Sequence, residues 1–177
     1  MRKQQKILWI RRGIFVLLLV CAHLVQNTPG WFPSLFGIRA YFLLTFTVCL
    51  GLFEREIGGA MFGLFAGALW DTVSPLGDGY HAFLFLLVGA ACGVLINTVM
   101  RNNLVTAFLL NTAAHLLYAA LYAVLFVSAQ GIDGAGWLFL RYFLPSALVS
   151  VLFTPIVYLI VRFVMRRTRV QSVYSVR

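Results

Sequence analysis

Three residues that could perform acid–base chemistry, Asp71, Asp78 and His81, lie close together in the sequence. A carboxylate beside an imidazole can orient the ring and share its proton, as general base catalysis requires. No activated nucleophile accompanies them. The sequence also contains no Gly-x-Ser-x-Gly elbow, no His-Glu-x-x-His motif and no phosphate-binding glycine loop. We therefore predict that the chain is not an enzyme.

A stripe of small residues precedes this group. Gly59, Gly63, Gly67 and Asp71 recur every four residues, which places them along one face of an α-helix. Glycine has no side chain, so a neighbouring helix can approach closely along such a stripe. The spacing predicts a helix-packing groove within this protein. A docking face for a membrane helix of a partner protein is the alternative, and the two are compatible.

The stripe ends at a carboxylate and a turn. Ser74, Pro75, Gly77 and Asp78 are typical turn residues, and Asp78 could cap the helix that follows. An ionisable residue near a membrane is costly unless it is paired or hydrated. Asp71 could therefore be hydrated at the interface or cap this turn. We favour a polar anchor that holds the helices on either side of the turn in register.

Further polar residues interrupt apolar stretches of the chain. Asn111 and His115 are four residues apart and share a helix face, and Asn97 lies in the preceding apolar run. These three residues predict a polar seam inside a helix bundle, with interhelical hydrogen bonding favoured over a transport path. The roles of His23 and His115 stay open at this stage.

The composition excludes several classes of protein. The 177 residues are 62% hydrophobic and only 11% charged, a composition that is too apolar for a water-soluble protein. The formal net charge is +9, but the basic residues flank apolar runs, which favours contact with lipid headgroups over nucleic acid. The three cysteines are isolated within apolar runs, so we expect no metal site, disulfide or cofactor.

The apolar runs predict a single all-α membrane domain, a bundle of six transmembrane helices. The expected helices cover about residues 13–25, 38–53, 57–73, 80–100, 104–129 and 137–165, with basic ends at 1–12 and 166–177. All Lys and Arg residues except Arg39 and Arg141 then fall on one side, which predicts that both ends are cytoplasmic. Pro145 and Pro155 predict a bent last helix or an interfacial piece before Pro145.

Phe62 to Asp71, the Ser74–Gly77 turn and the apolar helix from His81 to Gly93 together resemble the rod shape-determining protein MreD family. The resemblance implies a multi-pass protein of the bacterial cell membrane. It implies a non-enzymatic scaffold subunit of the cell-wall elongation complex, which maintains cell shape and supports lateral peptidoglycan synthesis. The partners it implies are MreC, the RodA glycosyltransferase, a class B penicillin-binding protein and, directly or indirectly, the MreB filament.

The MreD family is in turn thought to resemble, in fold, the substrate-binding subunits of energy-coupling-factor vitamin transporters. Such a subunit is the alternative function, although the Ala-x-x-x-Ala contact common in their first helix is absent here. The alternative predicts an outer pocket beneath the Gln26–Gly37 loop with convergent polar groups. The candidate polar groups are Asn27, Asp71, Asp78, His81 and Asp133.

Overall fold

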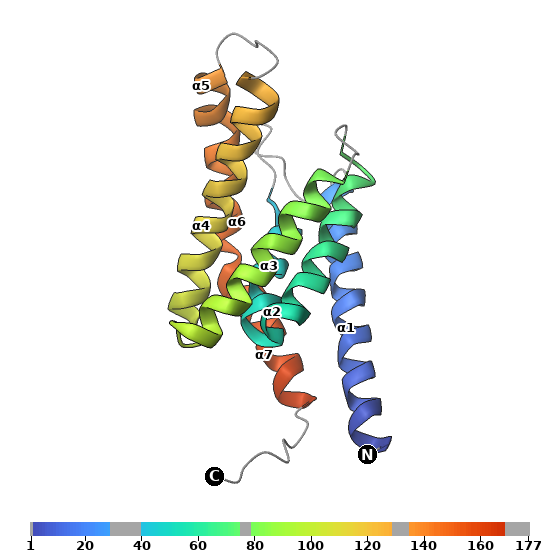
Figure 1. The fold of residues 1–177 in the computed structure, drawn as a ribbon. Helices are drawn as coiled ribbons and strands as arrows, with labels where there is room; N and C mark the ends of the chain where they lie inside the picture. Colours follow the sequence, from blue (N-terminus) through green and yellow to red (C-terminus); the bar gives the residue numbers. More distant parts are fainter. Residues whose placement is uncertain (1, 29–39, 75–78, 129–134, 169–177) are drawn as a thin grey trace.

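The computed structural model describes residues 2–28, 40–74, 79–128 and 135–168, and these residues form helices and connecting turns without strands (Figure 1). The predicted all-α class is confirmed. The predicted turn residues Pro75, Gly77 and Asp78 lie outside the described residues. In chain order the elements are α1 (Arg2–Asn27), α2 (Phe42–Asp71), α3 (Tyr80–Thr98), α4 (Leu104–Tyr122), the π-helical segment η2 (Ala123–Ser128), α5 (Ala135–Leu138), the π-helical segment η3 (Phe139–Phe143), α6 (Leu144–Leu152) and α7 (Thr154–Arg167).

Helix α1 begins earlier than the apolar pattern predicts. It is continuous from Arg2, whereas the predicted helix began near residue 13 and residues 1–12 formed a separate basic end. Lysine, glutamine and arginine are good helix formers, and no glycine or proline interrupts the first turns. Arg11, on this extension, forms an ion pair with Glu54 in which Nε lies 2.8 Å from Oε1.

Helix α2 is broken at Arg55, whose φ of 63° and ψ of −168° are not helical. The chain turns back there: a β-carbon added to Gly59 would lie 2.7 Å from the Cα of Gly51. Residues eight apart in a straight helix are about 12 Å apart. The described parts of the predicted runs 38–53 and 57–73 therefore overlap the two arms of α2, which ends at Asp71, on either side of the Glu54–Glu56 turn.

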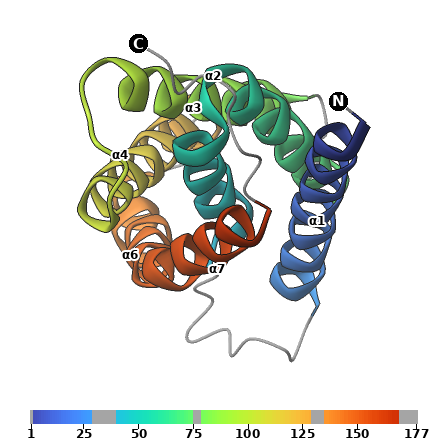
Figure 2. The same ribbon diagram turned by 90° about the horizontal axis from the view of Figure 1, so that it is seen from below.

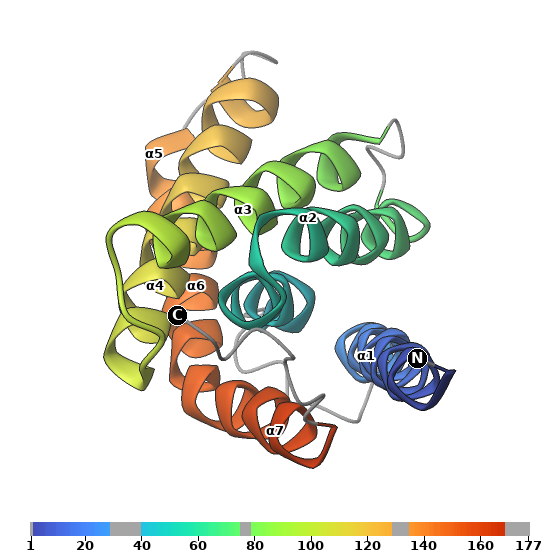
Figure 3. The ribbon, with the colours of Figure 1, turned by 60° about the horizontal axis from the view of Figure 1, so that its bottom comes forward.

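The first arm of α2, residues 42–54, is the centre of the molecule. Figures 2 and 3 show it enclosed by α1, α3, α4, α6 and α7. Leu43, Leu44, Val48 and Leu50 are completely buried, and so is the polar Thr47. Thr47 satisfies its hydroxyl by donating to the carbonyl of Leu43. Burial of polar side chains in an apolar interior is tolerated only when they are hydrogen-bonded in this way.

The last predicted helix, 137–165, is divided into several pieces. The chain bends by 41° between residues 140–152 and 154–167. The bend lies at Phe153, two residues before Pro155, which lacks an amide donor and cannot continue the hydrogen-bond ladder. Pro145 lies in the first turn of α6, where the missing donor is harmless. Upstream, the predicted helix 104–129 is α4 continued by η2.

Three helices among the described residues are long and apolar enough to cross a membrane. They are Gln4–Asn27, Tyr80–Thr98 and Leu104–Leu125, and the bent pair Leu140–Leu152 and Thr154–Arg167 makes a fourth if it is one span. The two arms of α2 complete the predicted six but are too short to meet the same criterion. The six-span count therefore stays a prediction.

The charged turns lie at one end of the molecule. The beginning of α1, the bend in α2, the α3–α4 connection and the end of α7 point towards the same end, and the end of α2, the start of α3 and α5 lie opposite (Figure 1). The ion pair of Arg11 and Glu54 therefore lies at the bend of α2, whereas Asp71 lies at the far end of the second arm.

Candidate functional site

The glycine stripe on the second arm of α2 faces α3 and is filled by it. A β-carbon on Gly63 would collide with the backbone carbonyl of Phe85, and one on Gly67 with the carbonyl of His81. A β-carbon on Gly59 would likewise meet the carbonyl of Gly89. Contacts of this kind are backbone against backbone, so no side-chain rotation can relieve them. The absence of a side chain is therefore what allows the two helices to approach.

Helix α3 carries a complementary set of small residues. A β-carbon on Gly89 would collide with the carbonyl of Gly59, and one on Gly93 with the backbone of Arg55 and Glu56. The glycine stripe is thus a groove occupied by this chain's own helix, as the packing interpretation of the sequence has it. We call the interface formed by Gly59, Gly63, Gly67, Gly89 and Gly93 the glycine seam.

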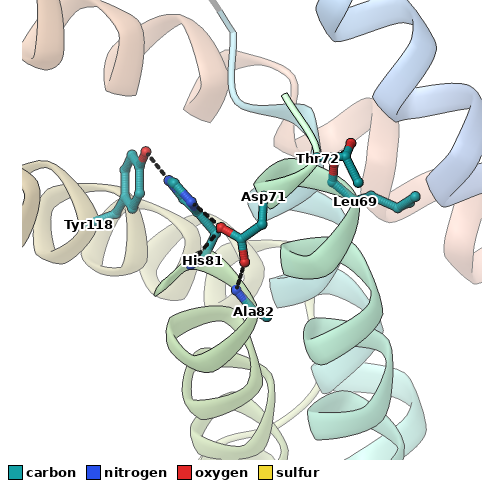
Figure 4. Close-up of polar contacts among 6 residues, drawn as sticks. All are labelled: Leu69, Asp71, Thr72, His81, Ala82 and Tyr118. Carbon is teal, nitrogen blue, oxygen red and sulfur yellow. Dashed lines mark hydrogen bonds and ion pairs between the residues drawn. The ribbon is translucent and has the colours of Figure 1, made fainter. Parts of the chain in front are cut away.

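Asp71 closes the glycine seam at its upper end (Figure 4). Its Oδ1 accepts from the backbone amide of His81 at 3.2 Å, and its Oδ2 accepts from the amide of Ala82 at 3.0 Å. The first amides of a helix have no partner within the helix, and a carboxylate there is also stabilised by the positive end of the helix dipole. Gly79, at the cap position of α3, has a φ of 80° and no side chain to offer. Asp71 supplies this cap from the preceding helix.

The same carboxylate holds the His81 side chain. Asp71 Oδ1 lies 2.7 Å from His81 Nδ1, and His81 Nε2 lies 3.2 Å from the hydroxyl of Tyr118 (Figure 4). These contacts fit an imidazole with its proton on Nδ1. Nδ1 then donates to the carboxylate, and Nε2 accepts from the tyrosine hydroxyl. Trp70 stacks on the ring, with centroids 5.3 Å apart. Asp71, His81 and Tyr118 therefore link α2, α3 and α4.

The Asp71–His81–Tyr118 chain has the connectivity of an oriented general base, and the same hydrogen bonds join three helices. A nucleophile would have to lie within about 2.6–3.2 Å of the base, and the atom at that distance from Nε2 is the tyrosine hydroxyl. No group of three His, Cys, Asp or Glu residues among those described is placed to hold a metal ion. The geometry is that of an interhelical anchor.

The predicted polar seam is divided between two places. Asn111 Nδ2 donates to Thr154 Oγ1 at 2.7 Å and more weakly to Thr45 Oγ1 at 3.4 Å, and so connects α4 to α7 and α2. His115 is completely buried, with Nδ1 2.8 Å from the carbonyl of Asn111. Asn97 does not join them, because it is exposed and donates to Glu56.

Several residues in these contacts carry no sequence signal. Tyr118 and Trp70 lie in apolar runs where an aromatic residue indicates only packing, and Thr45 and Thr154 are ordinary helix residues. The four-residue spacing of Phe85, Gly89 and Gly93 on α3 does repeat the spacing on α2. That repeat indicates the α2–α3 pairing, as does the prediction that Asp71 holds the helices on either side of the turn in register.

A small cavity lies beside the anchor. It measures about 200 Å³, and its lining includes Gln26, Asn27, Tyr41, His81 and Tyr118. Pockets for drug-sized or cofactor-sized molecules measure about 300–1,000 Å³. Of the polar groups that the transporter alternative requires, Asp78 and Asp133 lie outside the described residues. The cavity therefore gives the vitamin-transporter alternative no support.

These features define a class: an all-helical protein with several helices able to span a membrane, in which two central helices are joined at the backbone and anchored by a carboxylate. The chain belongs to the rod shape-determining protein MreD family, whose sequence model matches residues 9–167. The resemblance found in the sequence is thereby confirmed, and with it a role as a rod shape-determining membrane protein. No curated protein and no solved structure matches the chain significantly.

Proposed function

We propose that this protein is a non-enzymatic scaffold subunit of the bacterial cell-wall elongation complex, in which it supports lateral peptidoglycan synthesis. The observation that carries the proposal is the glycine seam, in a chain that belongs to the MreD family. A rod shape-determining protein whose central helices are fixed backbone to backbone offers a rigid framework. The polar groups at the end of the seam are consumed in holding helices together.

The proposed orientation places both ends of the chain in the cytoplasm. It is supported by the gathering of the helix ends and turns that carry most of the basic residues at one end of the molecule. Six spans, counting both arms of α2, agree with this orientation, because an even number returns the chain to the starting side. The proposed partners are MreC, RodA, a class B penicillin-binding protein and the MreB filament.

Purification from native membranes in mild detergent tests the partners. The proposal expects MreC and the wall-synthesis enzymes to accompany a tagged copy of this protein. Recovery of an ATP-driven transport module in their place would contradict it. In the same experiment Gly63→Leu/Gly67→Leu is expected to lose the partners and the rod shape of the cell, and Gly13→Leu, at an open position, is expected to keep both.

The non-enzymatic part of the proposal has its own test. Replacing His81 with glutamine removes any acid–base function while leaving groups able to hydrogen-bond. Cells that depend on this variant are expected to stay rod-shaped when its amount in the membrane matches that of the wild type. Loss of shape at an equal protein level would indicate that the imidazole does chemistry.

A further inference from the structure

Two arginines near the end of α7 lie between two adjoining clefts. Arg162, Arg166, Phe53 and Met165 line a cleft of about 300 Å³. The same two arginines, with Leu159, Ile160 and Phe163, line a second cleft of about 490 Å³. Arg162 and Arg166 are four residues apart, so their guanidinium groups emerge on one face of the helix. We call these two clefts and their lining residues the α7 cleft.

The arginines of the α7 cleft have no carboxylate partner among the described residues. The three acidic residues in the described part of the chain are engaged elsewhere: Glu54 with Arg11, Glu56 with Asn97, and Asp71 with His81. None of the described residues that line either half of the cleft is acidic. The site therefore presents two exposed positive charges without compensation, which calls for an anion.

Apolar surface continues from the arginines along the helix. Leu159 and Phe163 are 56% and 60% exposed, and Ile160 is 37% exposed. An inorganic ion would leave this surface unused, whereas a phospholipid would place its phosphate on the arginines and its acyl chains along the apolar side chains. Guanidinium groups match phosphate oxygens two by two, and anionic lipids are concentrated at the cytoplasmic face of membranes.

A larger groove at the bend of α2 provides a contrast. It measures about 650 Å³ between α1 and the bend of α2, and also contains arginines, Arg12 and Arg55. Glu54 and Glu56 line it too, so a phosphate there would meet like charge. Size alone would favour that groove, but charge favours the α7 cleft.

We propose that the α7 cleft is a binding site for one anionic phospholipid, with Arg162 and Arg166 holding its phosphate. This inference rests on the membrane placement proposed above and is independent of the role in wall synthesis. A lipid held there would bridge the end of α7 to Phe53, next to the turn of α2. It would fasten the last helix to the central one at the cytoplasmic end.

Native mass spectrometry of the full-length protein in detergent tests the site, with phosphatidylglycerol and phosphatidylcholine as probes. The wild type is expected to retain phosphatidylglycerol in preference to phosphatidylcholine. Arg162→Gln/Arg166→Gln is expected to weaken phosphatidylglycerol binding by about thirtyfold, since each of the two basic residues near a lipid surface contributes roughly 1 kcal/mol and about 1.4 kcal/mol is a factor of ten. The matched control, Arg12→Gln/Arg101→Gln, removes the same charge outside the α7 cleft and is expected to bind as the wild type does.

Three results would overturn the site: equal loss in the two double variants, equal retention of the two lipids, or displacement of the lipid by millimolar inorganic phosphate. Both arginines are exposed, so the double variant is expected to melt at the wild-type temperature. The single variant Arg166→Gln, with an intermediate loss expected, keeps the comparison decisive if the double variant melts early. A single variant that binds like the wild type would then count against the proposal.

Discussion

Two regions of this protein join helices in different ways. Between α2 and α3, glycines bring the backbones into direct contact, and side chains join the two helices at one end, where Trp70 and Asp71 contact His81. Between α4, α7 and the first arm of α2, side chains make the connection, through Asn111, Thr45 and Thr154. At the lower end Tyr158 donates to Asn102, whose amide donates to the carbonyl of Leu52.

The difference matters because lipid provides no hydrophobic drive for helices to associate. Backbone contact depends on fit alone, so a single added carbon disrupts it. A hydrogen bond between side chains tolerates small shifts of the helices. Its measured contribution to the stability of membrane proteins averages only about 0.6 kcal/mol. The glycine seam is therefore expected to be the rigid and vulnerable half of the molecule, and the hydrogen-bonded side the tolerant half.

The largest effect is expected at Gly67. Leucine there would collide with the carbonyl of His81 and the Cα of Ala82, which move only if α3 moves. Overpacking of this kind costs about 3 kcal/mol or more when backbone must shift. Unfolding followed in detergent measures it, with Gly13→Leu as the control. Equal stability of Gly67→Leu and Gly13→Leu would contradict the expectation that the glycine seam is the more vulnerable region.

Asp71 is expected to come next. Asp71→Ala leaves the amides of His81 and Ala82 and the His81 ring without their acceptor, at a cost of about 2 kcal/mol or more. Asp71→Asn keeps one acceptor oxygen and is expected to lose about half as much. Thermal unfolding of the three proteins gives the order. If asparagine and alanine are equally damaging, the charge matters more than the cap.

Asn111 tests the tolerant region. Asn111→Ala and Thr154→Val, with the double variant, form a cycle that isolates their hydrogen bond. The coupling is expected to be about 0.6–1.7 kcal/mol, because Thr154 keeps its own bond to the carbonyl of Val151. A coupling as large as the cost at Gly67 would show that both regions are equally rigid.

The smallest effect is expected at the bend between the two arms of α2. Arg55 has a φ of 63° and a ψ of −168°, a region almost restricted to glycine. Arg55→Gly is expected to raise the free energy of unfolding by up to about 1 kcal/mol, after the entropy that glycine loses. Arg55→Ala, which keeps the strain, should bring no such gain. Glycine less stable than alanine would contradict this account of the turn.

The sequence reveals much of the connectivity and little of the arrangement. The charged triplet Glu54–Glu56 coincides with the break in α2, and Asp71 is the last residue of that helix. The sequence does not reveal that residues 42–54 form the central arm, because helices in lipid are apolar on all sides and their hydropathy does not distinguish an inner face. The start of α1 was also missed, since polar helix formers continue a helix without adding hydrophobicity.

For the site, the period of four in Gly59, Gly63 and Gly67 indicates a close approach but not its partner. The anchor could be predicted only in outline. Asp71 was expected to tie two helices together, but nothing in the spacing points to Tyr118 on α4 as the third member. Asn97 shows the limit of grouping by polarity, since its neighbour is Glu56 and not Asn111.

One pair of substitutions tests the glycine seam most directly. At an exposed helical position, glycine to alanine stabilises by about 1 kcal/mol, so Gly13→Ala is expected to raise the free energy of unfolding. Gly63→Ala adds the same carbon against the carbonyl of Phe85 and is expected to lower it. Opposite signs in the same detergent are the predicted result. A gain in stability at both positions would show that α2 and α3 do not meet backbone to backbone.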